Sequence, residues 1–170
     1  MKKIMITALL ALFLSGCDNS PPAPYGFKWG QSMEEVKALN LEGVSECSGI
    51  TCVLSDTPDN TKGKTVIIFD HELGLVQVVH SEELEKVNKN IVLDRFSSVE
   101  SKLALVYGEP VSKIIRIDNE YDFFACLDKL GCSTIKSEYE KEGYKASVSI
   151  GTRKIDNKLA ILTDFTKPIK

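Results

Sequence analysis

Two apolar runs separated by a short turn place the strongest constraint on how this chain folds. The first run occupies residues 66–69 and the second residues 75–79, and both are rich in β-branched side chains. Such runs on either side of a short, glycine-containing turn are typical of a β-hairpin. We therefore predict a hairpin over residues 65–80, with His71 and Glu72 at its exposed tip.

A stretch of strict alternation predicts a further strand with one buried face. Tyr144, Ala146, Val148 and Ile150 are separated by polar residues, and a period of two places them on the same side of a strand. Other segments have the composition of strands but a less regular pattern. They are residues 50–54, 113–117, 133–139 and 159–165.

Two helices are predicted, over residues 33–41 and 95–107. Ser32 and Glu35 have the spacing of a capping box, which satisfies free backbone donors where a helix begins. In the second segment apolar residues recur every three or four positions, and a glycine ends the pattern. Asp94 is the expected N-cap of this second helix.

The predicted elements follow the order helix, strands, helix, strands. A Ser-x-x-Glu-x-Lys frame occurs at residues 32–37 and again at residues 97–102, which indicates two related repeats. An antiparallel sheet with both helices packed on one face buries the apolar side of every element. We therefore predict a single α+β domain over residues 25–170, built from two helix-then-strand repeats.

Residues 27–36 read Phe-Lys-Trp-Gly-Gln-Ser-Met-Glu-Glu-Val, and residues 103–110 close the second helix with Tyr-Gly-Glu-Pro. The first segment resembles the F-x-x-G-x-S-x-x-E-V opening of BamE-like and β-lactamase-inhibitor-like repeats, and the second resembles the way in which their helices end. The resemblance implies a non-catalytic protein that binds other proteins across an open sheet. This chain differs in its cysteine pairs and its longer second half.

The chain begins with a basic and then an apolar segment. Lys2 and Lys3 precede an apolar block over residues 4–14, which only Thr7 interrupts. The block has about half of the roughly 20 residues that a membrane-spanning helix needs. It is therefore typical of a secretory signal peptide, and we predict that residues 1–16 are removed.

The sequence Leu14-Ser15-Gly16-Cys17 closes this block. It resembles the lipobox of bacterial lipoproteins, in which the peptide is cut before the cysteine and the cysteine receives acyl chains. The resemblance implies a mature protein that several acyl chains at Cys17 attach to a membrane. The alternative is an ordinary signal peptide followed by a free or paired thiol at this position.

Polar and proline residues follow the cysteine. Asp18 and Asn19 resemble the signal that keeps enteric-type lipoproteins in the inner membrane, so the resemblance favours the inner over the outer membrane. Residues 18–24 contain three prolines, which favour an extended path. Residues 17–24 are therefore predicted to be a lipidated cysteine and a tether that holds the domain away from the lipid.

Four cysteines remain once Cys17 is assigned to the anchor. They lie in the sequence as two closely spaced pairs, Cys47 with Cys52 and Cys126 with Cys132. Four cysteines can be joined into two disulfides in three different ways. Short loops favour the two local pairs, because closing a short loop costs less entropy. An oxidising compartment would convert both pairs to disulfides. A zinc site is the alternative, but the spacings differ from zinc motifs and no companion histidines lie nearby.

Charge and motifs argue against several classes of function. Removal of Lys2 and Lys3 lowers the formal net charge from −3 to −5, which disfavours nucleic acid and anionic headgroups as partners. Neither of the two histidines lies in a His-Glu-x-x-His motif, and His80 is expected at the surface. Ser133 and Lys136 have Ser-x-x-Lys spacing, but in the predicted strand their side chains would point to opposite faces. We predict no catalytic residue, metal or cofactor.

Two other segments each have a binding alternative. Tyr25, Phe27 and Trp29 alternate with other residues, which predicts an extended segment that lays aromatic rings on the core. A carbohydrate- or peptide-binding strip is the alternative. Asp56 and Asp59 lie in a polar loop that has too few oxygen ligands for calcium, so we expect a solvated loop.

The anchor, the cysteine pairs and the lack of a catalytic motif lead to one functional hypothesis. We expect a periplasmic lipoprotein whose acidic, sheet-based surface binds another protein. Its role would be that of an inhibitor or immunity protein against an envelope-directed toxin or enzyme, or that of an accessory in envelope assembly. A lipid- or glycan-binding carrier is the alternative, and an enclosed apolar cavity or an exposed aromatic strip would favour it.

Overall fold

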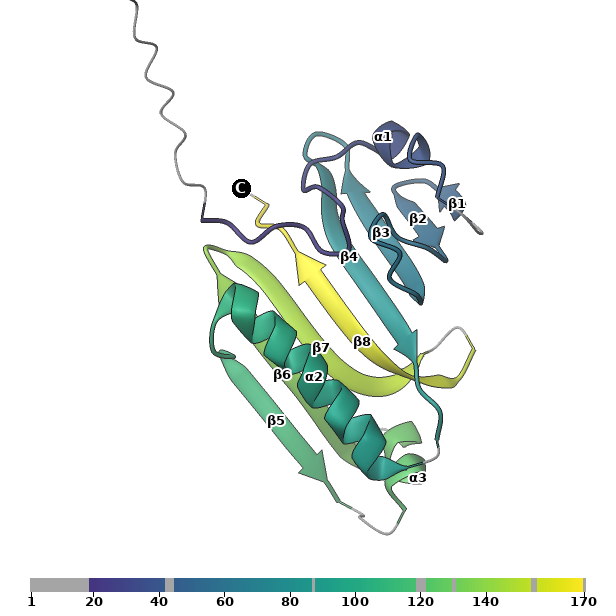
Figure 1. The fold of residues 1–170 in the computed structure, drawn as a ribbon, viewed down its shortest axis with the longest axis vertical. Coiled ribbons are helices and arrows are strands. Elements are labelled where there is room, and N and C mark those ends of the chain that lie inside the picture. Colours follow the sequence, from purple (N-terminus) through teal and green to yellow (C-terminus); the bar gives the residue numbers. More distant parts are fainter. Residues whose placement is uncertain are drawn as a thin grey trace, which may run out of the picture.

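The computed structural model describes residues 19–41, 45–86, 88–118, 122–129, 131–153 and 156–169. Within these residues the chain forms one antiparallel sheet of eight strands and three helices, which confirms the predicted α+β class (Figure 1). Over the same residues, no helix is long and apolar enough to cross a bilayer.

The strand order divides the sheet into two four-stranded halves. β1 to β4 lie side by side in chain order, and β8, β7, β6 and β5 follow, so that the last strand pairs with β4 and β5 lies at the far edge. Helix α2 carries the chain from β4 back to this far edge (Figure 1). The strands are β1 (Ser45–Ser48), β2 (Thr51–Leu54), β3 (Lys64–Asp70), β4 (Gly74–Glu83), β5 (Ser112–Ile117), β6 (Ser133–Lys141), β7 (Tyr144–Arg153) and β8 (Lys158–Thr166).

The first helix begins where the capping box predicts but is shorter than expected. α1 spans Met33–Lys37; the Ser32 hydroxyl accepts from the Glu35 N–H at 3.2 Å, and the Glu35 carboxylate accepts from the Ser32 N–H at 2.7 Å. The prediction of a helix as far as residue 41 is wrong. Asn40 adopts a positive φ of 46°, which ends the helical path.

The second helix begins before its predicted start. α2 spans Lys89–Tyr107, and the side chain of Asn88 caps it by accepting from the Asn90 N–H at 2.8 Å. Asp94 is therefore a residue of the second turn and not the N-cap. The extra turn forms because Val92, which is 1% exposed, continues the buried stripe toward the N-terminus. Gly108, with φ of 86°, ends the helix as predicted.

The core consists of two clusters that meet at the pairing of β4 with β8. Val78 belongs to one cluster, Phe165 belongs to the other, and the two residues are directly paired. Helix α2 packs on β6 and β7, while the buried residue of α1 lies among the side chains of β2, β3 and β4. The α2 cluster includes Val92, Phe96, Leu103, Tyr107, Tyr139, Val148 and Ile161, and the α1 cluster includes Phe27, Val36, Cys52, Ile67, Phe69 and Leu75.

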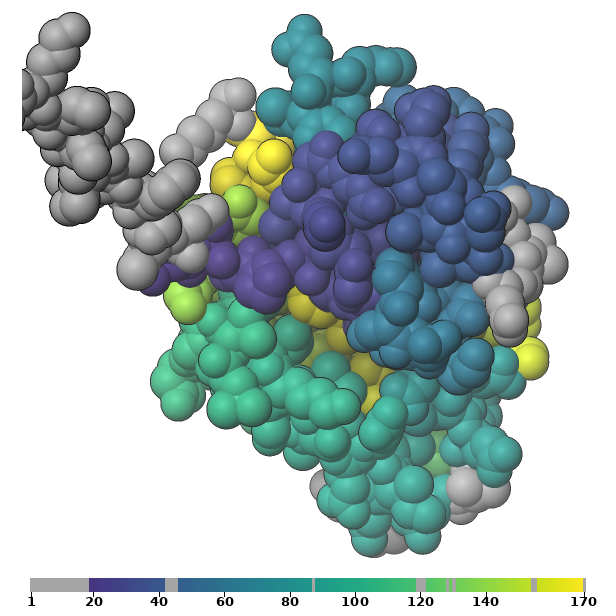
Figure 2. All heavy atoms as spheres, turned by 45° about the horizontal axis from the view of Figure 1, so that its top comes forward, coloured from purple at the N-terminus to yellow at the C-terminus, as the bar shows by residue number. Residues whose placement is uncertain are grey.

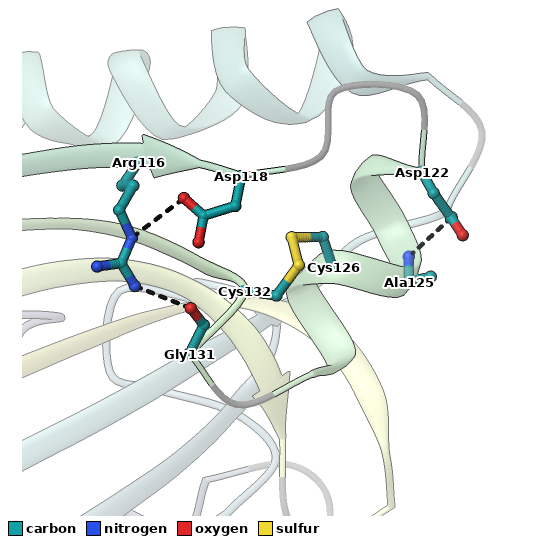
Figure 3. Close-up of a disulfide and its surroundings, with 7 residues drawn as sticks. All are labelled: Arg116, Asp118, Asp122, Ala125, Cys126, Gly131 and Cys132. Atoms are coloured by element: carbon teal, nitrogen blue, oxygen red, sulfur yellow. Dashed lines mark hydrogen bonds and ion pairs between the residues drawn. A yellow bond between two sulfur atoms is a disulfide. The ribbon is translucent and has the colours of Figure 1, made fainter.

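Both disulfides join the local pairs that were predicted. Cys47 and Cys52 face each other across β1 and β2, and Cys126 is bonded to Cys132 in the connection from β5 to β6. This second connection is not a simple loop, because it contains a third helix, α3 (Phe123–Asp128) (Figure 3). Phe123 is buried in the core, so α3 depends on tertiary contacts that a six-residue pattern does not reveal.

The aromatic residues near the N-terminus do not form the predicted extended segment. Tyr25 and Gly26 have positive φ values of 57° and 78°, so the chain turns there. Phe27 is buried, and the Trp29 indole N–H donates to the carbonyl of Pro21 at 3.1 Å. Pro21 is itself buried, so this end of the predicted tether is part of the fold and not a free spacer.

One buried carboxylate connects α2 to the edge of the sheet. Glu100 is 8% exposed; it accepts a hydrogen bond from the Ser137 hydroxyl and forms an ion pair with Lys113 at 2.8 Å. The Tyr139 hydroxyl donates to the Glu100 carbonyl at 3.3 Å. The residue thus links the helix to β5 and β6 through charge-assisted hydrogen bonds, which are stronger than neutral ones.

We predict that Glu100→Ala destabilises the fold by about 1–3 kcal/mol, because it leaves buried polar groups without their partner. Urea unfolding followed by circular dichroism measures the change. Glu109→Ala, at an exposed position just beyond the helix, is the matched control and should change the midpoint little. Equal losses from both variants would contradict this role of Glu100.

Candidate functional site

The centre of the sheet contains a line of buried polar side chains. His80 is 4% exposed, and its Nδ1 lies 2.9 Å from the Thr65 hydroxyl. The prediction of a surface histidine is therefore wrong. β4 continues past His80 to Glu83 and pairs there with β8, so His80 lies in the interior of the sheet, opposite Thr163.

Tyr25 covers this histidine from the N-terminal turn. The two rings lie 4.5 Å apart between centroids, and the Tyr25 hydroxyl lies 2.7 Å from the hydroxyl of Thr163. Burial raises the pKa of Tyr25 to about 12, so its hydroxyl keeps its proton and remains a hydrogen-bond donor. Tyr25 thus joins the N-terminal turn to both β4 and β8.

A crevice of about 310 Å³ opens beside these residues. β8 lies at its base, between α2 on one side and the N-terminal half of the chain on the other (Figure 2). Arg95 and Glu82 form a two-pronged ion pair at its rim, with distances of 2.7 and 2.8 Å. The apolar part of the lining comes from Val99, Leu103, Ile161 and Phe165, and the polar part includes Tyr25, Asp59, His80, Lys102 and Thr163.

The mixture of apolar and polar side chains in this crevice suits the binding of a small ligand. The pair of Thr65 and His80 has the atoms of a nucleophile and a base, but the side chain of Thr65 is fully buried, so a substrate cannot reach its hydroxyl. Among the described residues, no group of three His, Cys, Asp or Glu side chains is arranged to hold a metal ion. That this protein is not an enzyme stays a prediction.

Burial also determines how His80 responds to acid. Removal from water lowers the pKa of His80 below its ordinary value of 6.5. The unfolded chain therefore binds a proton at a higher pH than the folded chain does, and folding stability falls as the pH drops through about 6.5.

We predict that the free energy of unfolding decreases between pH 7 and pH 5, and that His80→Gln reduces this decrease. Urea midpoints measured at several pH values test the effect. His71→Gln is the control, because His71 is exposed at the hairpin tip as predicted. If His71→Gln removes as much of the pH dependence as His80→Gln, the assignment to His80 fails.

The other side of the sheet carries a patch of apolar side chains that belongs to neither core cluster. The side chains of Val53, Val66 and Val79 are aligned across β2, β3 and β4 by the strand register. Ile68 extends the patch along β3, and Leu162 extends it onto β8. Val53 is 37% exposed and the other four are half-buried. We call these five residues the apolar patch.

Polar side chains continue this side of the sheet beyond the apolar patch. Gln77 donates to both carboxylate oxygens of Asp164, at 2.8 and 3.1 Å, and Lys136 pairs with Glu138 at 2.6 Å. A network of charges closes one end of the sheet and connects β3, β4, β7 and β8. Its members are Lys64, Glu83, Arg153, Asp156 and Lys158.

The residues predicted from the sequence have different outcomes. Cys17 and Asp18 lie outside the described residues, and Asn19 is exposed. Asp56 is buried and accepts from the Thr57 N–H at 2.9 Å, so the expectation of a fully solvated loop is wrong there. The carboxylate of Asp59 accepts from the hydroxyl of Thr57, which makes this segment a hydrogen-bonded turn.

The crevice residues and the apolar patch were not recognised in the sequence. Tyr25, His80 and Arg95 come from three separated segments, and contacts with β4 bring them together: Tyr25 stacks on His80, and Arg95 pairs with Glu82. The sequence does contain a signal for the apolar patch. In β3 and β4 apolar residues occupy both the odd and the even positions, instead of alternating with polar ones. Such strands are apolar on both faces. Comparison with protein-family models, with curated proteins and with solved structures finds no match to this chain.

Proposed function

We propose that this chain is a membrane-anchored protein-binding module of a bacterial envelope and that the apolar patch is its docking surface. The patch itself carries the proposal: five apolar side chains are aligned on neighbouring strands, and neither core cluster includes them. A large contiguous apolar surface with a polar rim is typical of an interaction site.

The arrangement of the helices supports this proposal. Because Val78 and Phe165 are directly paired, their side chains lie on the same side of the sheet. Val78 packs in the cluster of α1 and Phe165 in the cluster of α2. We therefore infer that both helices cover one face and leave the apolar patch on the other. This is the arrangement that the resemblance to BamE-like and β-lactamase-inhibitor-like repeats implies.

The surroundings of the apolar patch indicate the kind of partner. Polar side chains on β4, β7 and β8 border it, which is the pattern of a protein interface with an apolar centre and a polar rim. The net charge disfavours nucleic acid. The partner in this proposal is an envelope-directed toxin or enzyme that the protein inhibits, or a component of envelope assembly.

We predict that a photoreactive phenylalanine derivative at Val53 crosslinks to one discrete protein in intact cells. Ile68→Lys in the same chain should reduce this adduct about tenfold or more, because a charge in the centre of an interface costs upwards of about 1.4 kcal/mol. Leu105 is the matched control position, because it is 88% exposed on α2. If Val53 yields no adduct, or if the adduct withstands Ile68→Lys, the apolar patch is not the docking surface.

The anchor in this proposal is a set of acyl chains on Cys17, with Asp18 and Asn19 favouring the inner membrane. Several acyl chains give lasting attachment, whereas a single chain gives only marginal binding. A spanning helix is then unnecessary, because the folded domain stays at the surface of the membrane.

We predict that metabolic labelling with a fatty acid marks the wild-type chain and not Cys17→Ser, and that mass spectrometry finds residues 1–16 removed from the wild-type chain but retained in Cys17→Ser. Cys17→Ser removes both the acceptor thiol and the cleavage motif. Cys47→Ser is the control, because it removes a disulfide cysteine and should retain the label. A wild-type chain with an unmodified amino terminus in mass spectrometry would contradict the anchor.

The crevice favours a second candidate function, a lipid- or glycan-binding carrier. Its base combines apolar side chains with the half-buried ring of Tyr25, and such a mixture suits a small amphipathic ligand. A volume of about 310 Å³ is at the lower limit for such sites, so the apolar patch is the better supported site. A ligand extracted with the purified protein would favour the carrier.

A further inference from the structure

The strand at the far edge of the second half is apolar on both of its faces. β5 pairs with β6 on one side, and the strand order ends there. Ile114 is 47% exposed, Ile115 is 54% exposed, and Val111, just before the strand, is 66% exposed. An edge strand with this pattern offers free backbone donors and acceptors together with apolar side chains, which is a template for a further strand.

The register shows that the apolar row of the core ends at this edge. Ile115 is paired with Ile135, and Ile135 is paired with Ile150. Ile135 and Ile150 are 1% and 7% exposed, whereas Ile115 is about half exposed. The row of isoleucines that begins in the core therefore ends at Ile115, on an edge strand that no other described part of the chain covers.

A second copy of β5 fits this edge. Two β5 strands can pair antiparallel about a twofold axis at Ile114. The Ile114 residues of the two copies then lie directly opposite each other. Val111 then lies opposite Ile117, and Lys113 lies opposite Ile115, where its aliphatic stem covers apolar surface. No basic side chain faces another one in this register.

The two basic residues of β5 do not oppose such pairing. Lys113 is paired with Glu100 at 2.8 Å. Arg116 is paired with Asp118 at 3.5 Å and donates to the Gly131 carbonyl at 3.0 Å (Figure 3). Both charges are balanced within one copy, so two edges can approach each other without strong repulsion.

We propose that two copies of this chain join through β5, in antiparallel register about Ile114, and extend the sheet across both molecules. The opposite edge is a poorer candidate, because β1 has four residues and a disulfide ties it to β2. The apolar patch lies on β2, β3, β4 and β8, away from β5 in the strand order, so a pair of molecules keeps two docking surfaces. The proposal does not rest on the proposed function.

The test is a disulfide crosslink in cells that express the full chain with Ile114→Cys. Directly opposed residues in an antiparallel pair have Cα atoms about 5 Å apart, within the range for a disulfide, so we expect about tenfold more dimer than from Leu105→Cys on a non-reducing gel. Leu105 is 88% exposed on α2 and reports random collisions. The unsubstituted chain shows the background from its own cysteines.

A second variant tests the same register without changing Ile114. Ser112 lies opposite Arg116 of the other copy in this arrangement, so Ser112→Cys combined with Arg116→Cys should also give the dimer. The proposal is overturned if both variants give no more dimer than Leu105→Cys, or if their thiols are trapped by a different protein. Either failure leaves the crosslink from Val53 unaffected, so it is distinguishable from a failure of the proposed function.

Discussion

The pairing of β4 with β8 is the interaction on which the rest of this structure depends. It joins two four-stranded halves into one sheet, and it brings the α1 cluster into contact with the α2 cluster through Val78 and Phe165. It also buries His80 opposite Thr163, where Tyr25 covers both. Without this pairing each half would expose one long edge, and the crevice between the halves would not exist.

Much of the local structure follows from the sequence, because short-range chemistry determines it. The capping box of Ser32 and Glu35, the stop at Gly108 and the alternation from Tyr144 to Ile150 each act within a few residues, and the structure contains all three. The two local disulfides also follow from spacing alone. The α+β class could be predicted because these signals agree with one another.

The errors occur where distant parts of the chain decide the outcome. His80 resembles a strand-end surface residue until β8 pairs with β4, and Asp94 resembles a cap until Val92 is known to be buried. Tyr25 turns back toward the sheet because Thr163 and His80 lie there. The candidate site combines residues of this kind, which is why the sequence indicates a binding protein but does not reveal the binding surface.

Each disulfide ties the first and second strands of its half near their connection: Cys47–Cys52 joins β1 directly to β2, and Cys126–Cys132 lies in the connection from β5 to β6. Each bond can therefore form as soon as its own hairpin or loop exists, whereas the pairing of β4 with β8 must wait for the last strand of the chain. Contacts that span a long stretch of sequence form slowly. A chain whose first half emerges before its second half would thus be able to form the first disulfide early and would pair β4 with β8 last, with the edge of β4 open in the meantime.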